Sequence, residues 1–231
     1  MQETLTATNE VNDWRDHATW YTHQTILPRL FKLIGRPLFR LVMSLERIDW
    51  DNIPDGPCIL APNHINNFDV LAIGLYFPRH PFYMTKKELF KNPVLSWLIR
   101  LCGAFPVNRG GRDAWTMGQA GRVLQAGQML CMFPEGTRSG RKAQLRRGKP
   151  GTVKLALENK VPIVPAAILG TQHIKIGRKL PKVTLQVGEP LDVATLAGSP
   201  PYTNQTIREL TTLLMQRIAK MLPPEHRGVY V

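Results

Sequence analysis

Residues 58–76 read CILAPNHINNFDVLAIGLY and join a short apolar run to a helix-length segment through a polar loop. The run at 58–61 is typical of a buried strand, and residues 67–76 are typical of the helix that follows it. The same alternation continues along the chain. Further strands are predicted at 82–85, 104–107, 129–133, 163–169 and 183–187, and further helices at 87–101, 113–126, 149–158 and 204–222. This order predicts an α/β fold with a mostly parallel central sheet flanked by helices on both faces.

The polar loop of this first unit contains a histidine and an aspartate five residues apart, His64 and Asp69. On one continuous helix the two side chains would point about 140° apart. The spacing suits a histidine that ends the strand and a helix capped by Asn66 or Asn67, with Asp69 in its first turn. The carboxylate would then hold one imidazole nitrogen and leave the other as a general base. The alternative is a structural or solvated histidine.

Two more polar clusters follow predicted strands, and sites in open α/β sheets form beyond the carboxyl ends of the strands. Arg109 comes after the strand at 104–107, and the run Glu135-Gly136-Thr137-Arg138 comes after the strand at 129–133. A guanidinium group is a planar fork that matches phosphate oxygens. Arg109 and Arg138 are therefore candidate phosphate ligands, whereas the cations after Arg138 could simply be a solvated basic loop. The uncharged stretch 161–168 is either plain core or the lining for an apolar tail.

The composition excludes some classes of protein and indicates a class of partner. The chain has 231 residues, of which 43% are hydrophobic, so disorder is excluded as the main state. The formal charge of +13 indicates an anionic partner, which could be nucleic acid, an acidic membrane surface or a phosphorylated substrate. The three cysteines are too scattered for a zinc site or a disulfide framework, and they favour a reducing compartment.

Residues 1–55 are predicted to form an N-terminal arm, and residues 56–231 are predicted to form the α/β domain. In the segment 29–48, basic residues fall along one stripe of a helix and leucine and isoleucine residues collect on the opposite side. This pattern predicts amphipathic helices, divided near Pro28 and Pro37, that lie on an anionic membrane surface. The alternative is a helix that packs its apolar side on the body and leaves its arginines in solvent. Because no run reaches about 18 uncharged apolar residues, a spanning helix is not expected.

Four motifs occur in an order that resembles the glycerolipid acyltransferases, and in particular the bacterial-type lysophosphatidic acid acyltransferases. They are His64-x4-Asp69, GAFPVNR at 103–109, FPEGTR at 133–138 and VPIVP at 161–165. The segment KKELF at 86–90 is also similar to that family. The resemblance covers about residues 56–190, and the chain departs from it at Asn66, where the family often has serine.

The resemblance implies a reaction and a set of site residues. His64, oriented by Asp69, would remove the proton from the sn-2 hydroxyl of lysophosphatidic acid. The hydroxyl would then attack an acyl thioester of coenzyme A or acyl carrier protein to give phosphatidic acid, without a covalent enzyme intermediate. The acceptor would be bound by Glu135, Gly136, Thr137 and Arg138, with Arg109 and Lys86 at its phosphate. No cofactor or metal is expected, and the protein would be peripheral at the cytoplasmic face of the membrane.

Two alternatives remain beside this assignment. Within the same chemistry, the acceptor could be another lysophospholipid, glycerol-3-phosphate or a lyso-aminolipid. In a different class, the positive charge could belong to a nucleic-acid-binding domain. Such a domain interleaves aromatic residues with its basic patches or carries a groove-reading motif. The basic run at 138–149 contains no aromatic residue, so nucleic acid is not expected as a partner.

Overall fold

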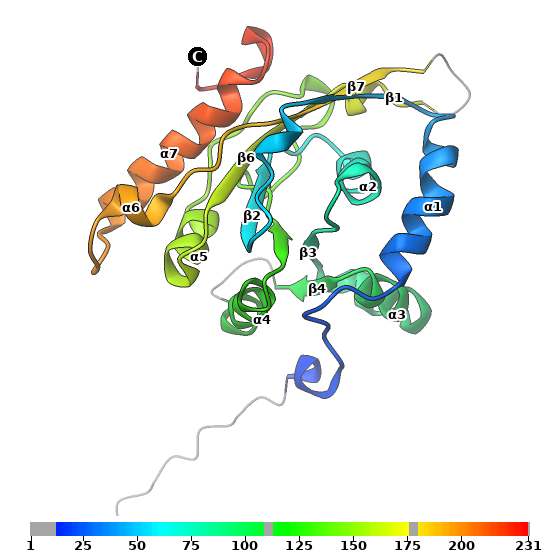
Figure 1. Ribbon diagram of the computed structural model, residues 1–231, viewed down its shortest axis with the longest axis horizontal. Coiled ribbons are helices and arrows are strands. Elements are labelled where there is room, and N and C mark those ends of the chain that lie inside the picture. The colour runs from blue at the N-terminus through cyan, green and yellow to red at the C-terminus, as the bar shows by residue number, and fades with distance from the viewer. Residues whose placement is uncertain (1–12, 109–112, 176–179, 231) are drawn as a thin grey trace, which may run out of the picture.

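The computed structural model describes residues 13–108, 113–175 and 180–230. These residues build a seven-stranded sheet in the order β1-β7-β6-β2-β5-β3-β4 (Figure 1). Neighbouring strands in it are parallel except for the antiparallel pair β6 and β7. The strands are β1 (Ser44–Ile48), β2 (Cys58–Pro62), β3 (Phe82–Lys86), β4 (Ala104–Val107), β5 (Met129–Cys131), β6 (Ile163–Leu169) and β7 (Lys182–Val187). The predicted α/β fold with a mostly parallel sheet is confirmed.

Each of the predicted segments 67–76, 113–126, 149–158 and 204–222 contains one helix, whereas the short helix at 193–197 was not predicted. The predicted helix at 87–101 is divided, because the side chain of Asn92 accepts a hydrogen bond from the Leu95 N–H and caps a new helix that starts at Pro93. A 3₁₀ turn, Lys87–Phe90, precedes that cap. The α-helices are α1 (Leu27–Phe39), α2 (Asn67–Tyr76), α3 (Pro93–Leu101), α4 (Ala114–Gln125), α5 (Gly151–Asn159), α6 (Val193–Ala197) and α7 (Asn204–Lys220).

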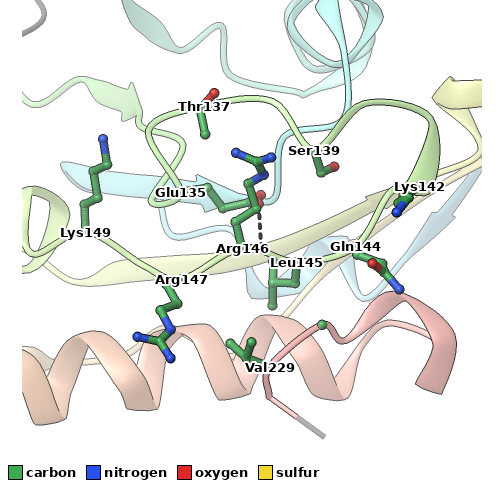
Figure 2. A pocket seen from close by; sticks show the side chains of 11 residues that line it. Glu135, Thr137, Ser139, Lys142, Gln144, Leu145, Arg146, Arg147, Lys149 and Val229 are labelled. Carbon is green, nitrogen blue, oxygen red and sulfur yellow. Dashed lines mark hydrogen bonds between the residues drawn. The ribbon is translucent and has the colours of Figure 1, made fainter.

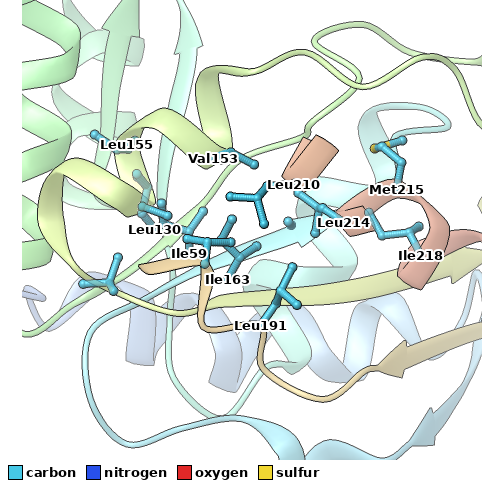
Figure 3. Packing of buried hydrophobic residues seen from close by; sticks show 14 of the residues in the cluster. Ile59, Leu130, Val153, Leu155, Ile163, Leu191, Leu210, Leu214, Met215 and Ile218 are labelled. Carbon is cyan, nitrogen blue, oxygen red and sulfur yellow. The ribbon is translucent and has the colours of Figure 1, made fainter. Parts of the chain in front are cut away.

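Both faces of the sheet are buried, as the alternation of side chains along β2 shows. Ile59 and Ala61 belong to a core that includes residues of α4, α5 and α7. Figure 3 shows Ile59 in this core with residues of α5 and α7. Cys58 and Leu60 belong to a second core on the opposite face, with residues of α2. Successive residues of a strand point to opposite faces. A strand buried on both sides reads as a continuous apolar run, which is why the sequence pattern located it.

The segment 29–48, predicted to be helical, is helical only in its first part. α1 ends at Phe39, and the last five residues of the predicted helical segment 29–48 form strand β1, which pairs with β7 in parallel. The prediction of helix over 44–48 was therefore wrong. Five residues are too few to separate a helical from a strand period, and β7 offers an edge that β1 can pair with. Pro37 lies inside α1 instead of dividing it; so close to the last turn, it removes little of the helical hydrogen bonding.

The orientation of α1 is the reverse of an ordinary surface helix. Two of its cations face the body, where Lys32 Nζ donates to the carbonyl of Phe77 at 2.6 Å and Arg36 Nε donates to that of Leu75 at 2.8 Å, whereas Arg29 is exposed. Burial, with the charge of Arg36 adding to it, lowers the pKa of Lys32 to about 8. Its apolar side chains face outward, with Leu33 72% and Ile34 64% exposed. The alternative in which the apolar side packs on the body is therefore wrong.

Gly35 explains how α1 can lie with this side against α2. A Cβ atom at Gly35 would come within 2.5 Å of Leu75 Cδ2, so the two helices approach closely at this point. In the residues that the structure describes, neither α1 nor any other helix has the length and apolar composition needed to cross a bilayer.

Candidate active site

The carboxyl ends of β2, β3, β4, β5 and β6 lie at one edge of the sheet, because these strands run in the same direction. The polar residues singled out in the sequence follow these ends. His64 lies two residues beyond β2, Lys86 ends β3, Asn108 follows β4 and the turn that contains Glu135 follows β5. The topology thus brings four loops to the edge where α/β folds form their sites.

His64 and Asp69 have the geometry that their spacing predicts. Asn66 caps α2 by accepting a hydrogen bond from the Phe68 N–H at 2.8 Å. Asp69, in the first turn, accepts one from the backbone N–H of Asn66 at 2.8 Å, which completes a capping box. The same carboxylate oxygen lies 2.8 Å from His64 Nδ1. The asparagine that departs from the family pattern therefore serves as the helix cap.

The Asp69 carboxylate is completely buried and has several donors. Besides the imidazole and Asn66, it accepts the Ile65 N–H at 2.6 Å and the Thr171 hydroxyl at 2.6 Å. Because an ionised carboxylate only accepts, His64 Nδ1 carries the proton of their hydrogen bond and Nε2, on the far side of the ring, keeps its lone pair. The network therefore holds the imidazole in the tautomer that a general base requires.

Thr171 is a site residue that the sequence pattern missed. It is fully buried, and its backbone carbonyl accepts a hydrogen bond from Asn66 Nδ2 at 2.9 Å. It follows Gly170, whose φ of +98° and close approach to the carbonyl of Lys182 admit only glycine. The pair Gly170-Thr171 directly after an apolar strand was the one sequence feature that could have indicated a site residue here. Nothing local in the sequence connects this pair with Asp69.

The imidazole of His64 lines an apolar cavity of about 380 Å³. The ring stacks on Phe133 with 3.8 Å between the ring centroids, and 13% of the side chain is exposed. The walls include three methionines, Met84, Met117 and Met132. The stretch 161–168 does not line this cavity; β6 contributes to the two cores instead, so its interpretation as plain core is the one the structure supports.

Glu135 binds the protein's own backbone. One carboxylate oxygen accepts the His64 N–H at 2.7 Å and the other accepts the Arg146 N–H at 2.8 Å, and the residue is buried. Burial raises the pKa of Glu135 to about 7, although both hydrogen bonds act in the opposite direction. The carboxylate therefore connects the loop of His64 to the loop that leads to α5.

The tip of the turn after β5 is exposed and lies against the loop of His64. Gly136 has a φ of +67°, which suits the tight turn, and Thr137 and Arg138 follow it in solvent. Arg138 Nη1 donates to Asn67 Oδ1 at 2.9 Å, at the start of α2. The backbone N–H of Ser139 donates to the carbonyl of His64 at 2.8 Å. The structure therefore places Arg138 beside the histidine–aspartate loop.

Lys86 lies on another side of the His64 cavity. Its side chain is exposed and lines a cavity of about 490 Å³ together with Lys87, Val107 and Asn108. The last two of these residues also line the His64 cavity, so the two cavities adjoin. Arg109, the other predicted phosphate ligand, lies outside the described residues.

Cys131 also lines the His64 cavity, but it does not have the character of a nucleophile. Burial raises the pKa of its thiol far above the ordinary value, and the charge of Asp69 raises it further. A thiol is reactive as a thiolate, so Cys131 is inert at neutral pH. Within the described ranges, no group of three His, Cys, Asp or Glu side chains is arranged to hold a metal ion.

Comparison with known proteins identifies the family of this chain. The model of the Acyltransferase family matches residues 45–169. A 1-acyl-sn-glycerol-3-phosphate acyltransferase of Bacillus subtilis is 33% identical over 173 residues, which are 74% of this chain and 84% of the relative. One of Haemophilus influenzae is 31% identical over 195 residues, 80% of this chain and 78% of the relative.

A solved structure has the same fold. The crystal structure of the 1-acyl-sn-glycerophosphate (LPA) acyltransferase from Thermotoga maritima superposes with a TM-score of 0.64 at 27% identity, covering 80% of this chain and 76% of that one. The chain belongs to the acyltransferase family, and it is an enzyme of that class.

Proposed function

We propose that the protein transfers a fatty acyl group from a thioester to the sn-2 hydroxyl of lysophosphatidic acid, and that the product is phosphatidic acid. The observation that carries this proposal is the hydrogen bond between His64 Nδ1 and the buried Asp69, which leaves Nε2 as a base at the wall of an apolar cavity. The names of the relatives from Bacillus subtilis and Haemophilus influenzae support the choice of acceptor.

The reaction follows from the position of the base. His64 Nε2 accepts the proton of the acceptor hydroxyl while the hydroxyl oxygen attacks the thioester carbonyl. The resulting imidazolium is stabilised by the negative charge of Asp69. The attack forms the new C–O bond and gives a tetrahedral intermediate. When this intermediate collapses, the C–S bond breaks, and the proton passes from the imidazolium to the departing thiolate. No acyl-enzyme forms in this sequence of steps.

Two cations near the His64 cavity suit the phosphate of the acceptor. Arg138 lies beside the His64 loop, and Lys86 lies beyond Asn108 in the adjoining cavity. We assign acceptor binding to Arg138, Lys86 and the turn residues Gly136 and Thr137, together with Arg109. Glu135, which the resemblance placed in the acceptor site, supports this turn through its two backbone hydrogen bonds.

The exposed apolar side of α1 suits a lipid surface at the cytoplasmic face of the membrane. Its leucines and isoleucines point away from the body, and α3 adds exposed apolar side chains, among them Val94 and Trp97. Thr25, just before α1, donates from its hydroxyl to the carbonyl of Leu101 at the end of α3, so the two surfaces are connected. An exposed apolar surface of this kind is typical of a membrane-contact site. The positive charge of +13 adds attraction to anionic lipids.

The experiment that tests the reaction is acyl transfer by the purified protein to a panel of acceptors. The panel contains lysophosphatidic acid, another lysophospholipid, glycerol-3-phosphate and a lyso-aminolipid, each offered with acyl coenzyme A and with acyl carrier protein. We expect the highest kcat/KM with lysophosphatidic acid. A protein that prefers any other acceptor of the panel would contradict the proposed substrate, and a protein that transfers no acyl group would contradict the proposed reaction.

Flotation with anionic vesicles tests the membrane contact. We expect Leu33→Asp, on the exposed side of α1, to reduce the bound fraction several-fold, because a charge in the lipid interface opposes burial. Leu196→Asp is the matched control, since Leu196 is an exposed leucine on α6. Equal binding by the two variants would contradict a role for α1.

A further inference from the structure

A second cavity, of about 690 Å³, lies beside Glu135 and is strongly basic. Its lining includes four cations and the side chains of Thr137 and Ser139, and all of these residues are shown in Figure 2. Among the residues that line it, Glu135 is the one acid, and both of its oxygens are already bonded to backbone N–H groups. The four cations are Lys142, Arg146, Arg147 and Lys149.

The backbone that carries these cations is held firmly. The N–H of Arg146 donates to Glu135, that of Gly148 donates to the Tyr230 hydroxyl at 2.9 Å, and that of Lys149 donates to the carbonyl of Pro134 at 2.8 Å. The cationic side chains are exposed. Like charges that a fixed loop holds around one cavity repel one another. A bound polyanion offsets this repulsion, so the cavity is suited to bind one.

Figure 2 shows how the groups are arranged. The guanidinium of Arg146 points to the region between Thr137 and Ser139, Lys149 and Lys142 lie on either side of it, and Arg147 points toward α7. Guanidinium groups and hydroxyls are the donors that bind phosphate oxygens in proteins. The cavity therefore offers donors to several phosphate groups at once.

Lys149 connects this basic cavity with the active site. It lines both the basic cavity and the cavity of His64. Its side chain lies across the turn after β5, because a Cβ atom at Gly136 would come within 2.9 Å of Lys149 Cδ. An anion in the basic cavity is thus a neighbour of the reacting groups, on a different side from Lys86 and Asn108.

We propose that the basic cavity binds the phosphate groups of acyl coenzyme A, so that its thioester reaches His64 past Lys149. This inference rests on the proposed acyl transfer, in which two anionic substrates meet at one base. The acceptor phosphate has its cations at Arg138 and Lys86, which leaves the four cations of the basic cavity for the donor; Thr137, assigned to the acceptor, also lines this cavity. Its volume is that of a small-molecule site. An acyl carrier protein would instead need a protein interface of about 800 Å² on each partner.

The test compares two doubly charge-reversed proteins. Arg146→Glu/Arg147→Glu removes two cations of the cavity, and Lys154→Glu/Arg208→Glu makes the same charge change at exposed positions on α5 and α7 that do not line it. The thermal midpoint of each variant shows that the fold is retained. Binding of coenzyme A is measured by equilibrium dialysis, and KM is measured separately for acyl coenzyme A and for lysophosphatidic acid.

We expect the cavity variant to raise the Kd of coenzyme A and the KM of acyl coenzyme A about 10-fold or more, which is the effect of losing charge-assisted contacts to phosphate. The KM of the acceptor and both constants of the control variant are expected to change less than 2-fold. A rise in the acceptor KM alone, or an unchanged Kd for coenzyme A, would overturn the proposal. So would an unmodified protein that uses only acyl carrier protein and does not bind coenzyme A. Because dialysis needs no turnover, it tests the cavity even where the proposed acceptor proves wrong.

Discussion

Two loops at the same edge of the sheet differ in how their charged groups are held. In the loop between β2 and α2, the Asp69 carboxylate is buried and accepts hydrogen bonds from its own loop and from Thr171. In the loop between β5 and α5, the backbone is fixed by Glu135 and Tyr230, whereas the cationic side chains extend into solvent. The first arrangement suits chemistry, which needs one exact geometry, and the second suits binding of flexible anions. Substitutions in the first loop are expected to lower kcat, and substitutions in the second to raise KM.

The largest effect is expected from Asp69→Asn. An amide in place of the carboxylate presents an NH₂ group to donors and removes the charge that stabilises the imidazolium. We expect kcat to fall about 10²–10⁴-fold, the range found for a disabled general base. Steady-state kinetics measures this loss, with circular dichroism as the check on folding. A folded variant with unchanged kcat would show that the first loop does not perform the chemistry.

Glu135→Gln tests the connection between the two loops through the pH dependence of stability. Burial raises the pKa of Glu135 from 4.5 to about 7, so the folded protein keeps this proton where the unfolded chain has lost it. Between those pH values the folded state binds more protons, and the free energy of unfolding falls as the pH rises. Glutamine does not titrate.

We therefore compare the free energy of unfolding of the unmodified protein with that of Glu135→Gln. The difference in favour of the unmodified protein is expected to fall by up to about 3 kcal/mol between pH 4.5 and pH 7, and to stay constant above pH 7. Urea denaturation of both proteins at several pH values measures this difference. A difference that is constant with pH would show that folding does not raise the pKa of Glu135.

A smaller effect is expected from Thr171→Val, which keeps the shape of the side chain and removes the hydroxyl that donates to Asp69. Loss of one hydrogen bond to a buried carboxylate costs about 1.5–3 kcal/mol. We expect kcat to fall about 10-fold, with a shift in the pH profile of kcat/KM and little change in the acceptor KM. Thr171→Ser, which restores the hydroxyl, is expected to recover most of the activity. Equal kcat in the valine variant, the serine variant and the unmodified protein would exclude a positioning role.

The smallest effect is expected from Arg138→Ala in the second loop. Because Arg138 is exposed, water screens its interaction with a phosphate. Its guanidinium also donates a hydrogen bond to Asn67. We expect the acceptor KM to rise a few-fold to about 10-fold with kcat nearly unchanged. Kinetics at varied lysophosphatidic acid concentration measures this, and an unchanged KM would count against phosphate recognition by this arginine.

The sequence predicted the fold well where strands are buried on both sides, because such strands are continuous apolar runs. It failed at β1, whose five residues join the edge of the sheet within a segment with helical periodicity. It also predicted that α1 is amphipathic but could not decide which side faces the body. That choice depends on the carbonyl groups at the end of α2 and on the close approach at Gly35, which are properties of the assembled structure.

The candidate site divides in the same way. The hydrogen bond between His64 and Asp69 was predictable, since both residues belong to one local turn with a recognisable helix cap. The role of Thr171 was not, because its contact with Asp69 joins residues 102 positions apart. The two backbone contacts of Glu135 were missed for a similar reason, since a polar residue beside a glycine turn is equally compatible with ligand binding and with support of a loop.

The central claim is that His64 is the base that removes the proton from the acceptor hydroxyl, and His64→Ala tests it most directly. Single-turnover transfer from acyl coenzyme A to lysophosphatidic acid measures the chemical step, with both substrates saturating and with the fold verified by thermal denaturation. We predict a rate about 10²–10⁴-fold below that of the unmodified protein, with binding of both substrates retained. A folded His64→Ala protein that transfers the acyl group at the unmodified rate would contradict the claim.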